Sequence, residues 1–380
     1  MKKIILTYRA QQFSEEILPK IIKYKKDIIY LITQNKMDDK FLRVLIKMEG
    51  LEVDINILTA QDILNGDLDN MKFDNIVGNP PYQIPIGDGN KTKTIWDALT
   101  VKFFDILKDG GEMSLIHPSS WRFTTPNSSG NLKKVKDIYN TNKIVYAEFN
   151  DKAKGMEVFG VQTDYDVITL QKGIKPNQTK ASTKSEEVQI IFNEFNVIPT
   201  DKISLFQRLK AKENEKKVEL MFDSSYHTQK NELIQKESCS KFKHPVVYTI
   251  TEKEGIKFWY SNTKNNGHFD IPKLILKKGA LSTILDLEGE YGMTQFACAI
   301  IDTPENLIKI QKVIGSKKTS LMQVSFTGSG DINAFVDNKG NMFKFIKEFR
   351  KDWWKEFYTP EMEQELIEEG VLDANGKYIG

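Results

Sequence analysis

The sequence has few of the features that mark secreted, membrane or metal-binding proteins. It holds only two cysteines, Cys239 and Cys298, which give neither a disulfide framework nor a cluster of metal ligands. Its apolar runs are far shorter than a membrane span, and the opening "MKKIILTYRAQQ" has too short an apolar stretch for a signal peptide. We therefore expect a protein of the reducing cytoplasm with no membrane partner and no metal site.

Net charge is also low, because the formal charge of the whole chain is only +2. The distribution is uneven, however. Residues 359–380 carry six acids and one base, so the rest of the chain has a net charge of +7. A mildly basic body permits the binding of phosphate groups but does not establish it, since solvated surface lysines would give the same balance.

Strand-like and helix-like segments alternate over the first 120 residues. Strands are predicted at "KKIILTY", "DIIYLIT", "EVDINILTA", "FDNIVGN" and "GEMSLIHPSS", with helices between them, the first of which Pro19 should kink or split. Two more strands are predicted at "KIVYAEFND" and "TDYDVITLQK". This order predicts an α/β fold with an open, doubly wound, mostly parallel Rossmann-like sheet.

The character of the sequence changes after residue 173. The stretch "GIKPNQTKASTKSEE" is polar and contains proline, which is typical of a linker. From about residue 246 short strand-like and aromatic segments follow and lead to the helix-like "FKFIKEFRKDWWKEFY". We predict an α/β domain at 1–175, a connecting region at 176–245, an α+β domain at 246–358 and an acidic tail at 359–380.

The tetrapeptide Asn79-Pro80-Pro81-Tyr82 directly follows the fourth predicted strand. Two consecutive prolines end a strand because neither can donate a ladder hydrogen bond. In open parallel sheets, ligands bind beyond the carboxyl ends of the strands, which is where this turn should lie. The position therefore suits a binding or catalytic turn.

The residue types of this turn suit one kind of ligand. An amino group on an aromatic ring is a poor nucleophile, because its lone pair is delocalised into the ring. The Asn79 side-chain oxygen and the Pro80 carbonyl, held in a proline frame, could accept both N–H bonds and make the nitrogen more nucleophilic. Tyr82 offers a flat face for stacking, so the turn could clamp a flipped base that carries an amino group.

The sequence resembles the N6-adenine (amino) DNA methyltransferases that carry the Asn-Pro-Pro-Tyr motif, in the branch related to Type II restriction-modification enzymes. The resemblance covers residues 70–175 and 245–358. The similar segments are "KFDNIVGNPPYQ", "FFDILKDGGEMSLIHPSSW", "GMEVFGVQTDYDVITL", "IPKLILKKGA", "GEYGMTQFACAIIDTPENL" and "FRKDWWKEF".

The resemblance implies transfer of a methyl group from S-adenosylmethionine to N6 of a flipped adenine in double-stranded DNA, in the cytoplasm of a bacterium or a phage-infected cell. Asn79 and Pro80 would hold the amine, with Pro81 framing the turn, while Tyr82 and Phe159 would contact the base. The fold would be a Rossmann-like methyltransferase domain followed by a target-recognition domain. A partner methyltransferase or restriction subunit would fit the same resemblance.

The cofactor side departs from the family pattern. The turn after the first strand reads "TYRAQQFSE" without a glycine, and Gln34 or Asn35 stands where an acid is expected after the second strand. Candidate cofactor contacts are Tyr8, Gln34 and Asp62. A Gly-Ser-Gly string at 328–330 resembles the cofactor turn of circularly permuted relatives, but we favour an ordinary loop of the recognition domain, because strands one to three are already accounted for near the N-terminus.

Three hypotheses follow from these observations. The chain is an active adenine methyltransferase with an atypical cofactor pocket, or a cofactor-deficient homologue that serves as the DNA-binding subunit of a heteromeric methyltransferase, or an enzyme with another donor or another amine substrate. No restriction nuclease is expected within this sequence, because no Pro-Asp…Asp/Glu-x-Lys arrangement is present.

Several basic residues are candidates for contacts with DNA phosphates. Lys91 and Lys93 lie in the loop after the motif, while Lys277 and Lys278 lie in the second predicted domain. Further candidates in that domain are Lys273, Lys317, Lys318, Arg350 and Lys351. Phosphate contacts would position the protein, and other residues would read the sequence.

Overall fold

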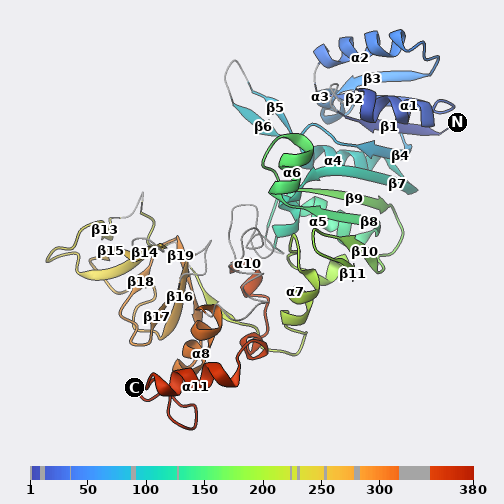
Figure 1. Cartoon of the computed structure of the whole chain (residues 1–380). Coiled ribbons are helices and arrows are strands. Elements are labelled where there is room, and N and C mark those ends of the chain that lie inside the picture. Colours follow the sequence, from blue (N-terminus) through green and yellow to red (C-terminus); the bar gives the residue numbers. More distant parts are fainter. Residues whose placement is uncertain are drawn as a thin grey trace. The chain divides into compact units, whose positions relative to one another are not determined.

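The computed structural model describes most of the chain (Figure 1). The described residues are 2–8, 13–34, 36–86, 91–125, 128–222, 225–228, 232–251, 255–277, 283–315 and 343–380. They divide into two compact units, Met1–Asp201 and Lys202–Gly380. Within the described residues, no helix has the length and apolar character needed to span a bilayer.

The first unit is built on a nine-stranded sheet, counted over the part of the chain that the structure describes. The strand order is β11-β10-β8-β9-β7-β4-β1-β2-β3. All neighbouring pairs are parallel except those that involve β9 or β11. The strands are β1 (Lys3–Thr7), β2 (Ile28–Thr33), β3 (Ile55–Thr59), β4 (Phe73–Gly78), β7 (Leu107–Pro118), β8 (Lys143–Asn150), β9 (Tyr165–Gln171), β10 (Thr179–Ser182) and β11 (Glu187–Ile190).

This topology confirms the predicted doubly wound, mostly parallel α/β sheet. The chain order reverses between β1 and β4, since β2 and β3 lie on one side of β1 and the later strands on the other. Such a switch point is where open α/β sheets bind ligands. The central strand β1 reads "KIILT" and buries four of its five residues, as expected for a parallel strand covered on both faces.

Helices cover the sheet and are short. They are α1 (Leu18–Lys23), α2 (Lys36–Met48), α3 (Ala60–Asn65), α4 (Trp96–Ile106), α5 (Asn131–Thr141) and α6 (Lys152–Phe159), with a π-helix at Phe13–Ile17 and 3-10 helices at Ser119–Phe123 and Phe192–Glu194. The break expected at Pro19 is present, because the π-helix ends at Ile17 and α1 takes Pro19 into its first turn. Proline suits this position, where its missing N–H would have no helical partner.

The region 176–245, expected to connect two domains, contributes strands to both units. Its first part forms β10 and β11 at the edge of the nine-stranded sheet, with Thr179 and Ala181 buried. Its last part forms β12 (Glu219–Met221) and β13 (Ile234–Gln235), which belong to sheets of the second unit. Between them lies α7 (Ile203–Leu209).

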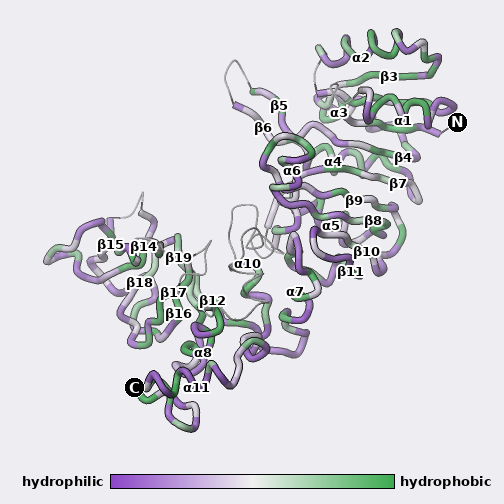
Figure 2. The backbone as a smooth tube through the Cα atoms, in the orientation of Figure 1, coloured by the Kyte–Doolittle hydropathy of each residue, from purple (hydrophilic) through white to green (hydrophobic). Residues whose placement is uncertain are grey.

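The second unit contains two four-stranded sheets among its described residues, in the orders β12-β19-β16-β17 and β13-β15-β14-β18. Their other strands are β14 (His244–Thr251), β15 (Gly255–Ser261), β16 (Lys273–Lys277), β17 (Thr283–Asp286), β18 (Gly292–Met293) and β19 (Ala297–Ile301). Apolar residues concentrate on β16 and β19 (Figure 2), which supply Ile275, Ala297 and Ala299 to a core cluster.

The helical elements of the second unit are α8 (Pro304–Gly315), α10 (Phe343–Ile346), a 3-10 helix at Trp353–Glu356 and α11 (Pro360–Glu368). One continuous helix was expected over 343–358, and this is wrong. Between α10 and the 3-10 helix, Phe349 and Arg350 form bridges with Lys210 and Lys217. Long-range pairing of the backbone therefore overrides local helix propensity there.

Gly78, the last residue of β4, lies unusually close to β1. Its φ is +143°, and a Cβ at this position would lie 1.9 Å from the carbonyl oxygen of Thr7. The next residue, Asn79, donates its backbone N–H to that same oxygen over 2.5 Å. Only glycine fits here, so the approach of β4 to β1 depends on this residue.

We expect the substitution Gly78→Ala to lower the free energy of unfolding by about 2–4 kcal/mol, since it adds backbone strain to a steric clash. Urea unfolding measures the change. The matched control is Gly50→Ala, where φ is +61° but no atom lies within 4 Å of the added Cβ. That variant should lose only about 1 kcal/mol. Equal losses in the two variants would show that the contact with Thr7 has no energetic weight.

Candidate active site

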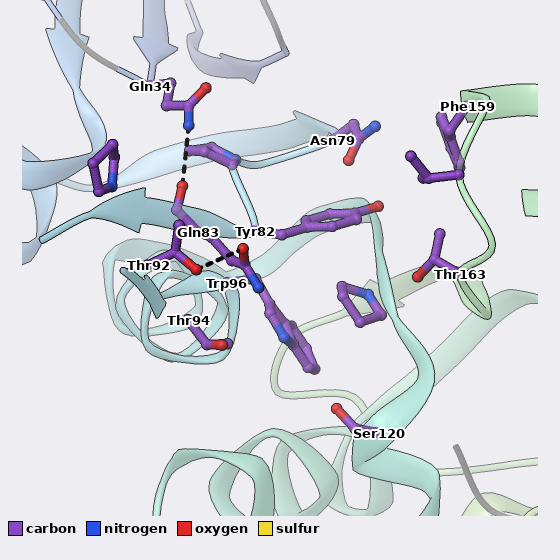
Figure 3. Close-up of a pocket in the computed structure, with 14 residues that line it drawn as sticks. Gln34, Asn79, Tyr82, Gln83, Thr92, Thr94, Trp96, Ser120, Phe159 and Thr163 are labelled. Atoms are coloured by element: carbon purple, nitrogen blue, oxygen red, sulfur yellow. Dashed lines mark hydrogen bonds between the residues drawn. The ribbon is translucent and has the colours of Figure 1, made fainter. Parts of the chain in front are cut away.

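A pocket of about 820 Å³ lies in the first unit beyond the ends of β2, β4 and β7 (Figure 3). Its volume is within the range of small-molecule sites. The residues that line it are Gln34, Asn79, Pro81, Tyr82, Gln83, Pro85, Thr92, Thr94, Trp96, Pro118, Ser120, Phe159, Val161 and Thr163. Four predicted site residues, Asn79, Pro81, Tyr82 and Phe159, therefore meet in one cavity together with Gln34.

Asn79 has an unusual hydrogen-bonding state. The residue is only 3% exposed, and its backbone N–H donates a hydrogen bond to the Thr7 carbonyl oxygen. Its side-chain Oδ1 is buried and has no hydrogen-bond partner in the described structure. A buried acceptor without a partner carries a free-energy cost of about 1–3 kcal/mol, which a ligand that donates a hydrogen bond would remove.

Pro80, Pro81 and Tyr82 form the turn that carries the chain from β4 into the pocket wall. Both prolines are buried, and Tyr82 is half-buried with its ring along the cavity (Figure 3). The carbonyl of Tyr82 accepts the backbone N–H of Ile95 over 3.0 Å, which joins the turn to the start of α4. The turn is thus fixed at both ends.

A two-stranded hairpin follows the turn, formed by β5 (Gln83–Pro85) and β6 (Thr92–Thr94). The Gln34 side chain, just after β2, donates to the carbonyl oxygen of Gln83 over 3.1 Å, and the Thr92 hydroxyl donates to the Gln83 side chain over 3.0 Å (Figure 3). Lys91 and Lys93 are exposed on this hairpin. The first half of the sheet is therefore tied to the hairpin through Gln34.

Phe159 and Thr163 form the opposite wall, at the end of α6 and just after it. A Cβ on Gly155 would lie 2.0 Å from the carbonyl oxygen of Thr163, so the helix can pack on this backbone only with glycine there. The ring of Phe159 packs edge-to-face on Tyr165, with centroids 4.8 Å apart and planes at 74°. Figure 3 shows Phe159 on the side of the cavity toward which Asn79 and the Tyr82 ring point.

The floor of the pocket rests on a stack of aromatic rings. Trp96 stacks on His117 with centroids 4.9 Å apart, and His117 stacks on Tyr139 with centroids 5.7 Å apart. His117 Nδ1 lies 3.0 Å from the Pro118 carbonyl, and its Nε2 lies 2.6 Å from the Tyr139 hydroxyl. A carbonyl can only accept, so Nδ1 carries the proton and Tyr139 donates to Nε2.

His117 is a structural residue and not a member of the pocket lining. It is fully buried, and burial lowers the pKa of its imidazole from 6.5 to about 4, so the ring is neutral at physiological pH. The neutral ring is the form that the two hydrogen bonds require.

The wall at Pro118 and Ser120 is anchored by a buried ion pair. Arg122 Nε lies 3.0 Å from Asp166 Oδ2, and both side chains are fully buried. The Arg122 guanidinium also donates to the Ile198 carbonyl and the Thr200 hydroxyl, each over 3.2 Å. Removing one partner would leave an uncompensated buried charge, so this pair holds the 3-10 helix after β7 against β9.

Two candidate cofactor contacts lie elsewhere. Tyr8 is 5% exposed and belongs to the core cluster of β1, and burial raises the pKa of its phenol well above its usual range. Asp62 closes a capping box at the start of α3, where its carboxylate accepts from the Thr59 backbone N–H and hydroxyl, each over 2.7 Å. Neither lines the pocket, and their assignment to a cofactor stays a prediction.

The basic residues of the second unit that were predicted to contact DNA phosphates differ in their environments. Lys273 is not a surface cation as expected, because its side chain is fully buried in an ion pair with Asp286 at 2.7 Å. Lys277 ends β16, while Lys278, Lys317, Lys318 and the Gly-Ser-Gly string at 328–330 lie outside the described residues. The described part of the chain contains no group of three or more His, Cys, Asp or Glu side chains that could hold a metal ion.

Sequence reasoning missed several residues of the pocket. Trp96, Ser120 and Thr163 all line it, yet none belongs to the Asn-Pro-Pro-Tyr motif. Ser120 follows the end of β7, and the rule that ligands bind at strand ends could have found it. Thr163 lines the pocket because of the contact between Gly155 and its carbonyl, for which the sequence holds no signal.

The fold and the pocket together define a class of protein. A sheet in which β3-β2-β1-β4-β7 run parallel, and in which antiparallel β9 separates β7 from β8, is the Rossmann-like methyltransferase fold. The pocket lies at the switch point of that sheet, with the Asn-Pro-Pro-Tyr turn on one side.

Residues 3–155 match the model of the Eco57I restriction-modification methylase family. The predicted resemblance to N6-adenine methyltransferases of the restriction-modification type is thereby confirmed for this part of the chain. An uncharacterized adenine-specific methylase of Mycoplasma pneumoniae is 39% identical over 127 residues, which cover 32% of this chain and 29% of that relative. The chain thus matches less than a third of the length of this relative.

Two solved structures share parts of the architecture. The methyltransferase subunit of a type I restriction-modification system from Streptococcus thermophilus is 17% identical with a TM-score of 0.36, over 50% of this chain and 45% of that one. The type IIG restriction endonuclease BpuSI is 11% identical with a TM-score of 0.43, over 97% of this chain and 57% of that one.

The neutral, buried His117 makes the stability of the protein depend on pH. Its pKa is about 4 in the folded protein against 6.5 when exposed, so between these values the unfolded chain binds more protons. Lowering the pH from 6.5 to 4 should therefore remove up to about 3 kcal/mol of unfolding free energy. The measurement is urea unfolding of the protein and of a His117→Gln variant across this range. Parallel pH curves for the two proteins would contradict the assignment.

Proposed function

We propose that the chain transfers a methyl group from S-adenosylmethionine to N6 of an adenine that has been flipped out of double-stranded DNA. The observation that carries the proposal is the unpaired, buried Oδ1 of Asn79 in the wall of the pocket. An exocyclic amino group is a hydrogen-bond donor of the kind that this oxygen lacks. The matches to adenine-specific and restriction-modification methylases support adenine as the base.

The aromatic rings of the pocket suit a planar ligand. Tyr82 lies in the turn and Phe159 in the opposite wall, and both line the same cavity. A base that enters between them exchanges its stacking in the duplex for stacking on protein rings. Phe159 is held edge-on by Tyr165, so its ring is positioned before a base arrives.

The amine would be made more nucleophilic by two acceptors. Asn79 Oδ1 would supply one. The carbonyl of Pro80, which the ring of Pro81 restrains, would supply the second, although Pro80 itself is buried and is not among the residues that line the pocket. Hydrogen bonds to both acceptors would pull the N6 hydrogens out of the ring plane and so reduce the conjugation of the nitrogen lone pair with the ring. Neither cysteine is needed as a nucleophile: Cys298 is buried and Cys239 is exposed, and both belong to the second unit.

The pocket also has a residue suited to the methyl donor. S-adenosylmethionine supplies an electrophilic methyl group on a sulfonium sulfur. Gln34 stands after β2, and its amide lines the pocket beside the turn, where it can hydrogen-bond ribose hydroxyls. The hydroxyl of Thr7, at the end of β1, is buried and has no partner within the described residues, but Thr7 does not line the pocket. Gln34 is therefore the residue of this pocket that would hold the cofactor, with an amide where the family has an acid.

DNA would approach the pocket past the hairpin β5–β6. Lys91 and Lys93 are exposed there, on the element that directly follows the Asn-Pro-Pro-Tyr turn. They are placed to contact phosphates next to a flipped nucleotide. Lys277 and Lys278 of the second unit remain proposed contacts of the same kind, and a methyltransferase or restriction subunit remains a proposed partner.

A second candidate function is supported by the engaged state of Asp62. This carboxylate is bound by the Thr59 backbone and side chain in the capping box, and the acid position after β2 is an amide. A chain of this kind could serve as a DNA-binding subunit beside a partner that holds the cofactor. Calorimetric titration of the isolated chain with S-adenosylmethionine separates the two functions, because only the first requires binding.

We expect Asn79→Ala to lower the rate of adenine methylation at least about 100-fold, because it removes a preorganised hydrogen-bond acceptor from the reacting amine. The assay digests the DNA after reaction and measures N6-methyladenine by mass spectrometry. DNA binding should change little, since phosphate contacts supply most of the affinity. Loss of DNA binding to the same degree as activity would mean that the turn is only structural.

The matched control for this variant is Asn75→Ala. Asn75 lies in the same strand, β4, but lines no part of the pocket. Its substitution should leave the methylation rate within a few-fold of the original. A large loss in both variants would indicate damage to β4 and not loss of a specific acceptor.

Tyr82 should act through its ring. Tyr82→Ala is expected to weaken productive binding of the base by about 1–3 kcal/mol, the usual contribution of one stacked aromatic side chain. Tyr82→Phe retains the ring and should retain most of kcat/KM. The test is the ratio of kcat/KM values on one duplex substrate. Equal losses in the two variants would exclude stacking as the role of Tyr82.

A further inference from the structure

A second cavity, of about 630 Å³, lies in the second unit on the sheet β13-β15-β14-β18. The residues that line it are Lys236, Glu237, Tyr248, Lys257, Phe258 and Trp259. Half of them are aromatic and three are charged, which is an uncommon combination for a cavity left over from packing. The residues come from β14, β15 and the segment after β13, so the cavity has a rigid base.

Three aromatic rings form a row beside this cavity, which we call the aromatic row: Trp259, Tyr248 and Phe296. Trp259 and Tyr248 have centroids 5.6 Å apart with planes tilted by 32°. Tyr248 and Phe296 have centroids 5.4 Å apart and meet edge-to-face. Phe296 is 42% exposed, and the other two rings are half-buried.

The core of the second unit explains only part of the aromatic row. Trp259 is half-buried and packs against the cluster of Tyr226, Val246 and Phe269. Tyr248 and Phe296, by contrast, belong to neither of the two clusters described for these sheets. Of the five tryptophans in the chain, the other four are at most 5% exposed. Trp259 is therefore the most exposed of the five tryptophans and lines this cavity, whereas Trp96 lines the pocket of the first unit.

The charges beside the row favour an anionic ligand. Lys236 and Lys257 flank the cavity and Glu237 is the one acid in its lining, so the lining carries a net positive charge. Aromatic faces next to lysines are the combination by which proteins hold single strands, because rings stack on bases while ammonium groups contact phosphates.

We propose that this cavity binds an unpaired nucleotide of DNA, with the base on Trp259 and Tyr248 and the phosphate near Lys236. Only an unpaired base offers both faces for stacking, so a paired duplex would not fill the cavity. This proposal rests on the proposed function, because it takes DNA as the substrate of the protein. It names a second DNA contact, in a unit separate from the methylation pocket.

The first experiment titrates the full-length protein with a single-stranded oligothymidine and follows tryptophan fluorescence. Stacking on Trp259 should quench the emission in a saturable manner. Because Trp96 lines the pocket of the first unit and can also respond, the same titration of Trp259→Leu gives the part of the quenching that is due to Trp259. A parallel titration uses an oligouridine of equal length. Equal quenching by both oligonucleotides would indicate a site for single strands in general, and weaker quenching by oligouridine would indicate a preference for DNA. Absence of quenching at saturating oligothymidine, with binding shown by anisotropy, would overturn the proposal.

The second experiment measures binding of a labelled oligothymidine by anisotropy for three variants. Trp259→Leu should weaken binding about ten-fold, while Trp259→Tyr keeps a ring and should bind within a few-fold of the original. Phe222→Leu is the control, because Phe222 is an exposed aromatic residue of the same unit that lies outside the cavity. Equal affinity of Trp259→Leu and the original protein would overturn the proposal.

The charge is tested separately with Lys236→Ala. The slope of log K against log salt should fall by about 0.7, the value for one phosphate contact on a single strand. Lys377→Ala, which removes an exposed lysine away from the cavity, should leave the slope unchanged. An unchanged slope for Lys236→Ala would show that Lys236 does not contact a phosphate and would overturn that part of the proposal.

Failure of this inference and failure of the proposed function give different results. If the protein methylates DNA and Trp259→Leu binds oligothymidine normally, the cavity is not a nucleotide site and the methylation function stands. A different result is that the original protein and Asn79→Ala both show no methylation activity while oligothymidine still quenches the fluorescence of Trp259. In that case the cavity binds nucleic acid in a protein that is not itself a methyltransferase.

Discussion

The contact between Gly78 and Thr7 is the constraint on which the pocket around Asn79 depends. The end of β4 approaches β1 so closely that no side chain fits at Gly78, and the Thr7 carbonyl accepts the Asn79 N–H. This bond fixes the Asn79 backbone, while its side-chain Oδ1 lies at the pocket with no hydrogen-bond partner among the described residues. The sheet thus sets the position of the acceptor before any ligand is present, which is what preorganisation requires.

The opposite wall is positioned in the same physical way. Gly155 allows α6 to pack on the Thr163 carbonyl, and Tyr165 then holds Phe159 edge-on. The buried Arg122–Asp166 pair fixes the start of β9, which directly follows this wall in the chain. Since both walls rest on backbone contacts and buried charges, movement of the pocket would require breaking interactions that are costly to lose.

The sequence predicted those parts of the protein that depend on local pattern. Alternating strands and helices predicted the sheet, and the motif at Asn79 predicted the turn and its place at a strand end. Contacts over long distances were not predictable. Lys273 looks like a surface cation but is buried against Asp286, a partner that only the fold brings near. Asp62 is a different case, because its partner Thr59 lies three residues earlier, and this local capping box could have been read from the sequence.

The side of the pocket that carries the Asn-Pro-Pro-Tyr turn is joined to the end of β2 by one side chain. The Gln34 amide donates to the backbone of Gln83, in the hairpin that directly follows the turn. A carboxylate at this position could not donate that hydrogen bond at neutral pH. An acid in place of Gln34 would therefore leave the Gln83 carbonyl without this donor, so the amide has a structural role in the pocket wall whatever ligand the pocket takes.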